Sequence, residues 1–281
     1  MAEKAHYPVR TLCAVLGVSA SGYYAWHRRP LITPQVRANR ALRTRIRLIH
    51  AESHGRYGSP RIHRALRAAG ECVGRNRVIR MMRAEQLRGR PTRRFRVTTE
   101  ADPTARPAPN RLNQVFVAPA PNRVWTADIT ALPTAEGWLY LAVLLDLYSR
   151  RIVGWAIRAS LATDLVCAAW RMAIARRAPG RDLIHHSDRG CQYTSDRYQR
   201  LLRAHRVICS MSRRGNCFDN APTESFFRTL KVELDETVWP TRHAAVRAVA
   251  DFIEDFYNTR RLHSTLNYQT PAAFEARQPA A

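Results

Sequence analysis

Hydrophobic residues recur at helical spacing in the first part of the chain. Residues 8–27 carry this pattern with a break at Gly17, and Ser19 stands where an N-cap would begin a second helix. The pattern returns over residues 57–87, where Gly70 separates two segments whose arginines fall opposite the apolar positions. Both stretches therefore predict helix-turn-helix-like units.

After about residue 121 the pattern changes to short apolar runs that are typical of β-strands. Three such runs follow in quick succession, which predicts an antiparallel meander, and helical and strand-like segments then alternate. The predicted elements are strands at 124–130, 138–146 and 151–157, a helix at 163–177, a strand at 182–188, a helix at 195–207, a strand at 207–212, and helices beginning at 220–222 and spanning about 243–258. This order predicts an α/β fold with a mixed sheet.

Composition shifts mark the expected domain boundaries. Between the helical and the α/β regions the chain becomes rich in Pro, Arg and Thr, which predicts a linker. The predicted organisation is a helix-turn-helix-like region at 1–56, a second such unit at 57–90, the linker at 91–120, the α/β core at 121–235 and a C-terminal helical extension at 236–281.

The charge of the chain indicates a polyanionic partner. It carries 46 Lys and Arg against 22 Asp and Glu, a formal net charge of +24. Residues 1–100 hold 22 of the basic and 5 of the acidic side chains, so the helical region is the expected electrostatic contact with nucleic acid. Almost all of the basic residues are Arg, which is consistent both with phosphate recognition by the guanidinium fork and with a GC-rich genome.

The remaining composition narrows the class of protein. Six cysteines form no CxxC pair, so neither a zinc finger nor a disulfide framework is expected. The N-terminus has no apolar signal region, and the longest apolar run is too short to span a bilayer. We therefore expect a cytoplasmic protein with no membrane partner.

Three acidic residues stand at positions where separate elements could bring them together. Asp128 lies in the first predicted strand, Asp188 at the exit of the fourth, and Glu224 in the first turn of the helix that follows. Clustered carboxylates repel one another unless a cation neutralises them, and Mg²⁺ or Mn²⁺ prefers such oxygen ligands. Two such ions serve phosphodiester chemistry. Each acid taken alone also has a structural interpretation, as a turn, loop or helix-terminus residue.

The sequence around these acids resembles a known family. The motifs that carry the resemblance are YGSPRIHRAL, WTADIT, HSDRGCQYTS, SMSRRGNCFDNAPTESFFRTLK and YNTRRLHSTLNYQTPAAF. They are similar to those of OrfB-type insertion-sequence transposases, relatives of the retroviral integrases, and they span nearly the whole chain. Cys191 stands where Ser is usual, and Thr223 occupies the variable position before Glu224.

This resemblance implies a ribonuclease H-like catalytic core at 121–235. It further implies that Asp128, Asp188 and Glu224 form a D,D,E triad that binds two Mg²⁺ (or Mn²⁺) ions. The activity that it implies is cleavage at the 3′ ends of a DNA element followed by strand transfer into target DNA. The implied partners are therefore double-stranded element ends and target DNA.

Several polar residues near the triad are expected to contact DNA. Arg228 and Lys231 follow Glu224 at helical spacing and should share its face. The preceding segment has a glycine between basic and amide side chains, which indicates a DNA-contacting loop. The predicted DNA-binding residues are Arg213, Arg214, Asn216, Arg228, Lys231 and His186, the last of which has a core role as an equal alternative.

Other polar residues are expected to be structural. Asp146 should order the turn that follows the second strand, Asp219 the loop before the helix of Glu224, and Asn220 the start of that helix. The segment with Arg260-Arg261 and His263 leaves two interpretations open, docking onto the core or contact with end DNA.

Two other functions are compatible with the residues. A structure-specific nuclease of the same fold would cut but never join DNA strands. A transposition regulator or inhibitor would bind element ends without turnover. The resemblance also implies a homo-oligomer on DNA and, because relatives often act as frameshift fusions, an upstream-frame protein or fusion partner.

Overall fold

The computed structural model describes residues 7–28, 33–89, 107–213, 216–234 and 238–277. It divides into two compact units, Met1–Gly89 and Arg90–Ala281. In the first unit, helices α1 (Val9–Val15) and α2 (Ala20–His27) form the predicted pair. The hydroxyl of Ser19 accepts a hydrogen bond from the amide of Gly22 at 3.0 Å, so its predicted role as N-cap is confirmed.

Three further helices of this unit pack together around a small apolar core. They are α3 (Pro34–Glu52), α4 (Ser59–Ala68) and α5 (Arg75–Ala84). Helix α3 was not predicted as an element of its own. It packs against α4 and α5, across the domain boundary expected at residue 56, because its apolar stripe is buried against these two helices. The buried side chains at the centre are Leu42, Ile46, Ile62, Leu66, Val78 and Met82.

Most arginines of α4 and α5 lie on the outer faces of these helices, as predicted, whereas the Arg77 guanidinium donates to the Asn39 side chain of α3 at 2.7 Å. Their buried positions alternate with charged ones at helical spacing, so the two helices present apolar residues to α3 and guanidinium groups to solvent. The exposed members are Arg64, Arg67, Arg75, Arg80 and Arg83.

The second unit is built on a five-stranded mixed sheet of order β3-β2-β1-β4-β5. Strands β1, β2 and β3 pair antiparallel as the predicted meander, whereas β4 and β5 run parallel to β1. The strands span Val124–Thr134, Gly137–Asp146, Ile152–Arg158, Ile184–Ser187 and Ile208–Met211 in chain order. The predicted α/β class and element order are confirmed, and the arrangement is ribonuclease H-like.

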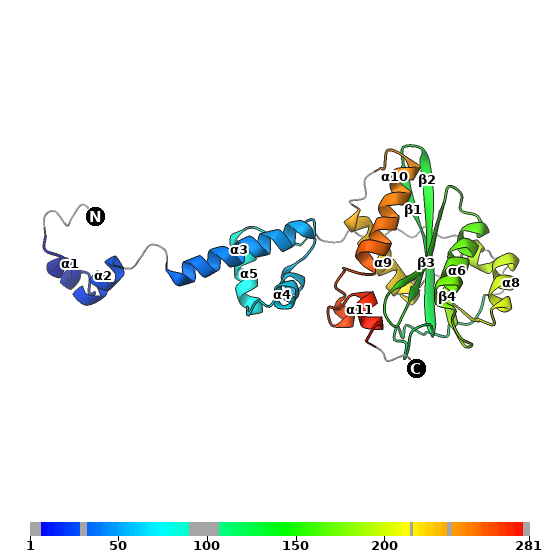
Figure 1. Ribbon diagram of the computed structural model, residues 1–281, viewed down its shortest axis with the longest axis horizontal. Coiled ribbons are helices and arrows are strands. Elements are labelled where there is room, and N and C mark those ends of the chain that lie inside the picture. The colour runs from blue at the N-terminus through cyan, green and yellow to red at the C-terminus, as the bar shows by residue number, and fades with distance from the viewer. Residues whose placement is uncertain (1–6, 29–32, 90–106, 214–215, 235–237, 278–281) are drawn as a thin grey trace. The chain divides into compact units, whose positions relative to one another are not determined.

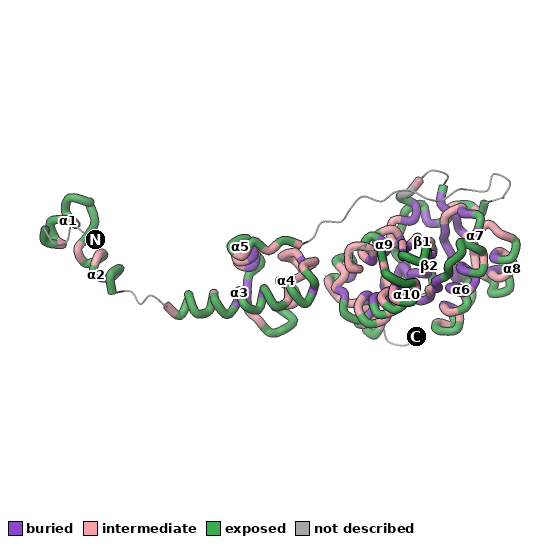
Figure 2. The backbone as a smooth tube through the Cα atoms, turned by 90° about the horizontal axis from the view of Figure 1, so that it is seen from above, coloured by how far each residue is buried: buried purple, intermediate pink, exposed green. Residues whose placement is uncertain are grey.

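Helices cover both faces of this sheet (Figure 1). One face packs against α6 (Thr163–Arg177), α7 (Cys191–Thr194) and α8 (Asp196–Ala204). The other packs against α9 (Ala221–Glu233) and α10 (Arg242–Asp251). Figure 2 shows that buried residues are concentrated along the strands and the inner sides of these helices, so the sheet separates two apolar cores.

The C-terminal segment docks on the same core. After α10 come a π-helical segment (Phe252–Tyr257), a 3₁₀ turn (Ser264–Leu266) and α11 (Pro271–Glu275). The Asn258 side chain accepts from the amide of Ile152 at 2.9 Å and donates to its carbonyl at 3.1 Å, which completes the edge strand β3.

Docking onto the core and contact with end DNA were both open for the segment that contains Arg261. Arg261 itself contacts the core. It is 9% exposed, and its guanidinium donates to the Glu233 carboxylate at 3.1 Å and to the Thr229 hydroxyl at 3.3 Å. The Arg261 side chain therefore docks the segment onto α9.

The described part of the expected linker also packs against the core, since Leu112 is buried and the Arg111 amide donates to Ser210 Oγ at 2.9 Å. No helix in the described ranges is long and apolar enough to cross a membrane.

Gly154 allows β3 to lie directly against α6. A Cβ at this position would lie 2.6 Å from the Cβ of Ala173 and closer still to the carbonyl oxygen of Ala169. We expect Gly154→Ala to lower the free energy of unfolding of the core by about 1–3 kcal/mol, because helix backbone cannot move aside cheaply. Urea unfolding followed by tryptophan fluorescence measures the change.

Gly180→Ala is the matched control. A Cβ there would meet no atom within 4 Å, so its unfolding midpoint should equal that of the unmodified chain or slightly exceed it. Equal midpoints for the two variants would show that the close approach of β3 and α6 is not a constraint.

Candidate functional site

The parallel pairing of β1 and β4 places Asp128 beside Asp188. Thr126 on β1 pairs with His186 on β4, and each aspartate stands two residues further along its own chain. Both side chains are partly buried at this end of β4. The Asp128 carboxylate accepts from the amide of Ile129 at 2.8 Å, and that of Asp188 accepts from the amide of Gly190 at 3.0 Å.

Two side-chain hydrogen bonds attach the first turn of α9 to β1. The hydroxyls of Thr126 and Thr223 lie 2.7 Å apart, and both residues are fully buried. The Asn220 amide donates to the carbonyl of Ala127 at 3.0 Å. These bonds join the helix residue before Glu224 to the strand residues before Asp128. The backbone that carries Glu224 is therefore attached to the strand that carries Asp128.

The pKa shifts of Asp128 and Glu224 are consistent with three acids that lie near one another. Burial raises the pKa of Asp128 well above its usual range, and the neighbouring charges of Asp188 and Glu224 raise it further, against the opposing effect of the Ile129 amide. Burial also raises the pKa of Glu224, while the nearby Arg228 guanidinium lowers it. Ionisation of all three carboxylates together is therefore unfavourable without a cation.

The donor chemistry of this site suits a hard divalent cation. Carboxylate oxygens are the ligands that Mg²⁺ and Mn²⁺ prefer, and the mutual repulsion at Asp128 is the kind that such an ion relieves. In the described part of the chain, however, no three His, Cys, Asp or Glu side chains are already gathered as a metal-binding group. The three acids thus share an electrostatic environment rather than a preformed ligand cage.

A buried tyrosine lies close to the two aspartates. Tyr193 is 2% exposed, and its hydroxyl has no hydrogen-bond partner among the described residues. Burial raises the pKa of this phenol, and so do the charges of Asp128 and Asp188. Tyr193 was not predicted as a site residue, although it belongs to the HSDRGCQYTS motif, because an aromatic residue between helical segments is ordinarily read as core.

The loop before α9 is organised by Asp219. Its buried carboxylate accepts from the Arg213 amide at 2.8 Å and from the Arg213 guanidinium at 3.0 and 2.8 Å, and the Asn110 and Gln114 side chains also donate to it. Hydrogen bonding from Arg213 is the main reason that the pKa of Asp219 lies well below its usual range, with burial opposing it. The predicted structural role of Asp219 is confirmed.

The same geometry places the loop residues that were expected to contact DNA. Arg213 is half exposed, but its guanidinium is held by Asp219. Arg214 lies outside the described residues. The Asn216 side chain accepts from the Phe218 amide at 3.0 Å and so caps the 3₁₀ turn Cys217–Asn220.

Asn220 stands at the N-cap position of α9, as predicted. Its side chain, however, makes no capping hydrogen bond and instead donates to β1. The predicted position of Asn220 is therefore correct, but its predicted capping contact is not, because its side-chain amide is bonded to β1.

His186 does not reach the surface. It is 0% exposed, and its ring nitrogens lie 2.8 Å from Ser210 Oγ and 3.2 Å from Ser212 Oγ on the neighbouring chain segment. The expectation that it contacts DNA is wrong, because the parallel β4–β5 pairing encloses its ring between the strands and the following loop. The alternative of a core histidine holds.

The two basic residues of α9 differ in their surroundings. Arg228 is exposed and close enough to lower the pKa of Glu224, as expected for residues on one helix face. Lys231 is partly buried and lines an apolar pocket on the same helix.

Asp146 is structural, as predicted. It is 0% exposed, and its carboxylate accepts from the amides of Asn122 and Tyr148 and from the Trp125 indole at 2.7, 2.9 and 3.3 Å. Burial raises its pKa to about 6 despite these hydrogen bonds.

Comparison with known proteins assigns the chain to a family. Residues 118–217 and 205–271 match models of the integrase core domain, and residues 37–95 match an HTH-like domain. A 31 kDa protein of insertion element IS600 from Shigella sonnei is 41% identical over 94% of this chain and 97% of its own length. Transposase InsF for insertion sequence IS3A from Escherichia coli (strain K12) is 38% identical over 97% and 96% of the two chains. A chain of the simian T-cell lymphotropic virus intasome, solved in complex with PP2A regulatory subunit B56 gamma, superposes with a TM-score of 0.48 and 15% identity over 84% of this chain and 76% of that one.

The buried state of His186 predicts a pH-dependent stability. Burial lowers its pKa from 6.5 to about 4, so the folded chain keeps the ring neutral while the unfolded chain takes up a proton below pH 6.5. The stabilisation from this ring is complete above pH 6.5 and is lost as pH falls toward 4. We expect the difference in unfolding free energy between the unmodified chain and His186→Asn to shrink by about 2 kcal/mol from pH 7 to pH 5.

Urea unfolding at the two pH values measures this difference, and comparison with the non-titrating variant cancels the effect of other groups such as Asp146. Asn keeps a polar atom near the position of Nδ1, which faces Ser210. A difference that is the same at both pH values would show that His186 is not held neutral by burial.

Proposed function

The chain belongs to the insertion-sequence transposases with an integrase core domain, and we propose that it cuts the 3′ ends of a DNA element and joins them to a target strand. The observation that supports this proposal is the placement of Asp128 beside Asp188 by the β1–β4 register, with the first turn of α9, which carries Glu224, hydrogen-bonded to β1. Carboxylates held together in this way are suited to cation-dependent phosphoryl transfer.

Asp128, Asp188 and Glu224 would hold two Mg²⁺ or Mn²⁺ ions. When bound, such ions supply an activated oxygen nucleophile and stabilise the leaving oxygen of the phosphodiester. The hydrogen bonds of Thr223 to Thr126 and of Asn220 to Ala127 keep the helix and strand that carry two of the acids in fixed relation. The Tyr193 hydroxyl, buried beside both aspartates, is available to donate a hydrogen bond to a carboxylate oxygen.

The proposed substrate contacts lie on the helical unit and on α9. Exposed arginines of α4 and α5 would neutralise phosphates of the element ends. Arg228 and Lys231 would meet the strand near the reacting phosphate, since they share a helix with Glu224. Arg213 would position the loop through Asp219 and contact DNA with its exposed edge.

The proposed reaction needs no nucleotide, because the 3′-hydroxyl released by cleavage attacks the target phosphodiester and one such bond replaces another. Its DNA substrates place the activity in the bacterial cytoplasm, on the nucleoid. Joining two element ends to one target calls for more than one active site, so we propose a homo-oligomer on DNA, alone or with an upstream-frame protein.

A direct test uses the purified chain with Mg²⁺ and labelled DNA from the ends of its element. We expect cleaved and joined strands, and we expect Asp128→Asn and Glu224→Gln to lower both products by at least about a hundredfold, because each variant removes a charged oxygen ligand. Separation of the labelled strands on a denaturing gel measures both steps.

Asp182→Asn is the control for this experiment. Asp182 is an exposed carboxylate of the same core with φ 73°, a conformation that asparagine tolerates, so its activity should be unchanged. Full activity in both triad variants would end the triad hypothesis. Cleavage without joining would identify a nuclease, and binding without any product would identify a regulator.

The hydroxyl of Thr223 is expected to matter for the rate. Thr223→Val keeps the shape of the side chain but leaves the buried Thr126 hydroxyl without this partner, which should lower the free energy of unfolding by about 1–3 kcal/mol. Displacement of Glu224 should also slow strand joining by about tenfold or more.

Thr223→Ser retains the hydroxyl and is the matched variant. Initial rates of strand joining, measured at a temperature where all three chains are folded, compare the two. If Thr223→Val joined DNA as fast as the unmodified chain, the hydrogen bond to Thr126 would have no role in placing Glu224.

A further inference from the structure

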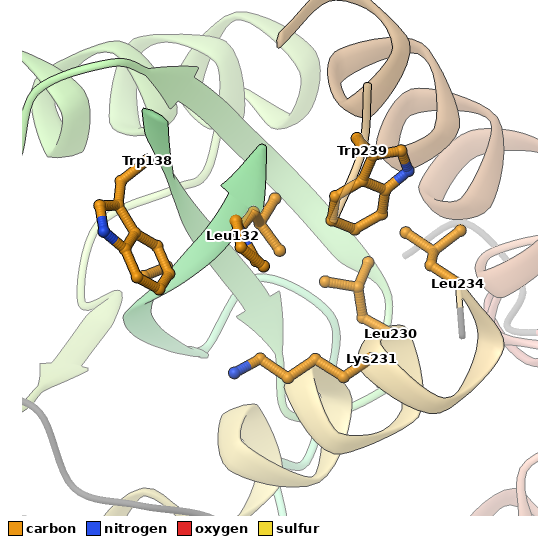
Figure 3. Close-up of a pocket in the computed structure, with 8 residues that line it drawn as sticks. Leu132, Trp138, Leu230, Lys231, Leu234 and Trp239 are labelled. Carbon is orange, nitrogen blue, oxygen red and sulfur yellow. The ribbon is translucent and has the colours of Figure 1, made fainter. Parts of the chain in front are cut away.

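An apolar pocket of about 240 Å³ lies between the β1–β2 hairpin and the second half of α9. Figure 3 shows the indole rings of Trp138 and Trp239 on either side of Leu132, with the Lys231 side chain extended below them toward the Trp138 side. We name this site the indole pocket. Its lining residues are Ala131, Leu132, Pro133, Trp138, Leu230, Lys231, Leu234 and Trp239.

Backbone pairing connects the two segments that carry the indoles. Trp138 pairs with Pro133 across the hairpin. The Trp239 amide donates to the Pro133 carbonyl at 3.2 Å, and the Trp239 carbonyl accepts from the Ala135 amide at 2.8 Å. Both indoles are therefore carried by backbone that is attached to the end of the hairpin, and little conformational freedom is left to lose on binding.

The indole pocket lies on two of the elements that carry the three acids, β1 and α9. Lys231 follows Glu224 by seven residues on α9, which is about 10 Å along a helix. Ala131 follows Asp128 by three residues on β1, which is about 10 Å along a strand. At ~3.4 Å per nucleotide, a DNA strand whose phosphate lies at the carboxylates passes this pocket within a few nucleotides.

We propose that the indole pocket binds one unpaired nucleobase of the DNA strand, stacked on Trp138 or Trp239, with a neighbouring phosphate on Lys231. This inference rests on the proposed function, from which it takes the nature of the substrate. Trp138 is 56% exposed, and an indole face in solvent beside an ammonium group is the combination with which proteins bind single-stranded nucleic acid.

Size and charge favour a base over a protein segment as the occupant. The volume lies below the roughly 300–1,000 Å³ of pockets for larger ligands and suits one flat heterocycle. A nucleotide offers an aromatic face to the indoles and an anionic oxygen to the lysine, and the chain carries a net charge of +24.

The test is a binding experiment that does not depend on catalysis. The probe is a labelled duplex with a single-stranded 3′ overhang of thymidines, and fluorescence anisotropy without divalent metal measures its affinity for the full chain. A set of probes replaces one thymidine at a time by an abasic nucleotide. The protein variants are Trp138→Leu, which keeps an apolar side chain, and Trp138→Phe, which keeps an aromatic face.

We expect Trp138→Leu to weaken binding of the intact overhang by roughly 5- to 150-fold, as for loss of one stacked base, and Trp138→Phe to bind close to the unmodified chain. One abasic position should weaken the unmodified chain by a similar factor and leave Trp138→Leu unaffected, since the two changes remove the same contact. For Trp239→Leu, the abasic substitution that no longer weakens binding should be at the same overhang position or at the adjacent one.

Three results would overturn the proposal. One is equal affinity of Trp138→Leu and the unmodified chain, and another is a loss that no single abasic position abolishes. The third is a change of oligomeric state in Trp138→Leu, seen by sedimentation, with DNA affinity retained, which would make the pocket a contact between protein chains. Failure of the unmodified chain to bind any DNA would instead count against the proposed function itself.

Discussion

The proposed active site depends on three acidic side chains that lie near one another in a partly buried position, where their charges repel. Asp128 and Asp188 are brought there by the parallel register of β1 and β4, which the whole sheet enforces. Glu224 is brought there by α9, whose first turn is hydrogen-bonded to β1 through Thr223 and Asn220. The folding free energy of the two apolar cores opposes this repulsion, and a divalent cation bound to the carboxylates, as proposed, would relieve it.

The fold assigns the charges of the chain to different tasks. In the helical unit, apolar stripes bury against one another and leave guanidinium groups exposed as an electrostatic surface for phosphates. In the α/β core, several arginines instead form ion pairs within the protein. Arg213 is held by Asp219, and Arg261 joins the C-terminal segment to α9. A high net charge is thus compatible with an ordered core, because several of its arginines form ion pairs within the protein.

α9 carries residues of both the proposed active site and the proposed DNA-contact surface. Its first turn carries Glu224, its exposed face carries Arg228, and its second half carries Lys231 at the edge of the indole pocket. The other side of that pocket is the β1–β2 hairpin, and β1 also carries Asp128. A strand of DNA that follows these two elements would therefore meet the carboxylates, a surface cation and the two indoles in sequence. The family relationship gives the class of reaction, and this geometry suggests how one strand is positioned for it.

The sequence by itself determined the element order, the mixed α/β class, the family and the positions of the three acids, because hydrophobic periodicity and contiguous motifs are local properties of the chain. Ser19 and Asp146 were interpreted correctly for the same reason, since Gly22 and Tyr148, the partners that define their predicted roles, lie within three residues of them. The tertiary structure alone decided the surroundings of His186, Thr223 and Tyr193 and the formation of the indole pocket. His186 is enclosed by serines of another strand and loop, and Thr223 bonds a residue 97 positions away. Such contacts depend on which elements become neighbours, and no spacing along the chain encodes that without the packed sheet.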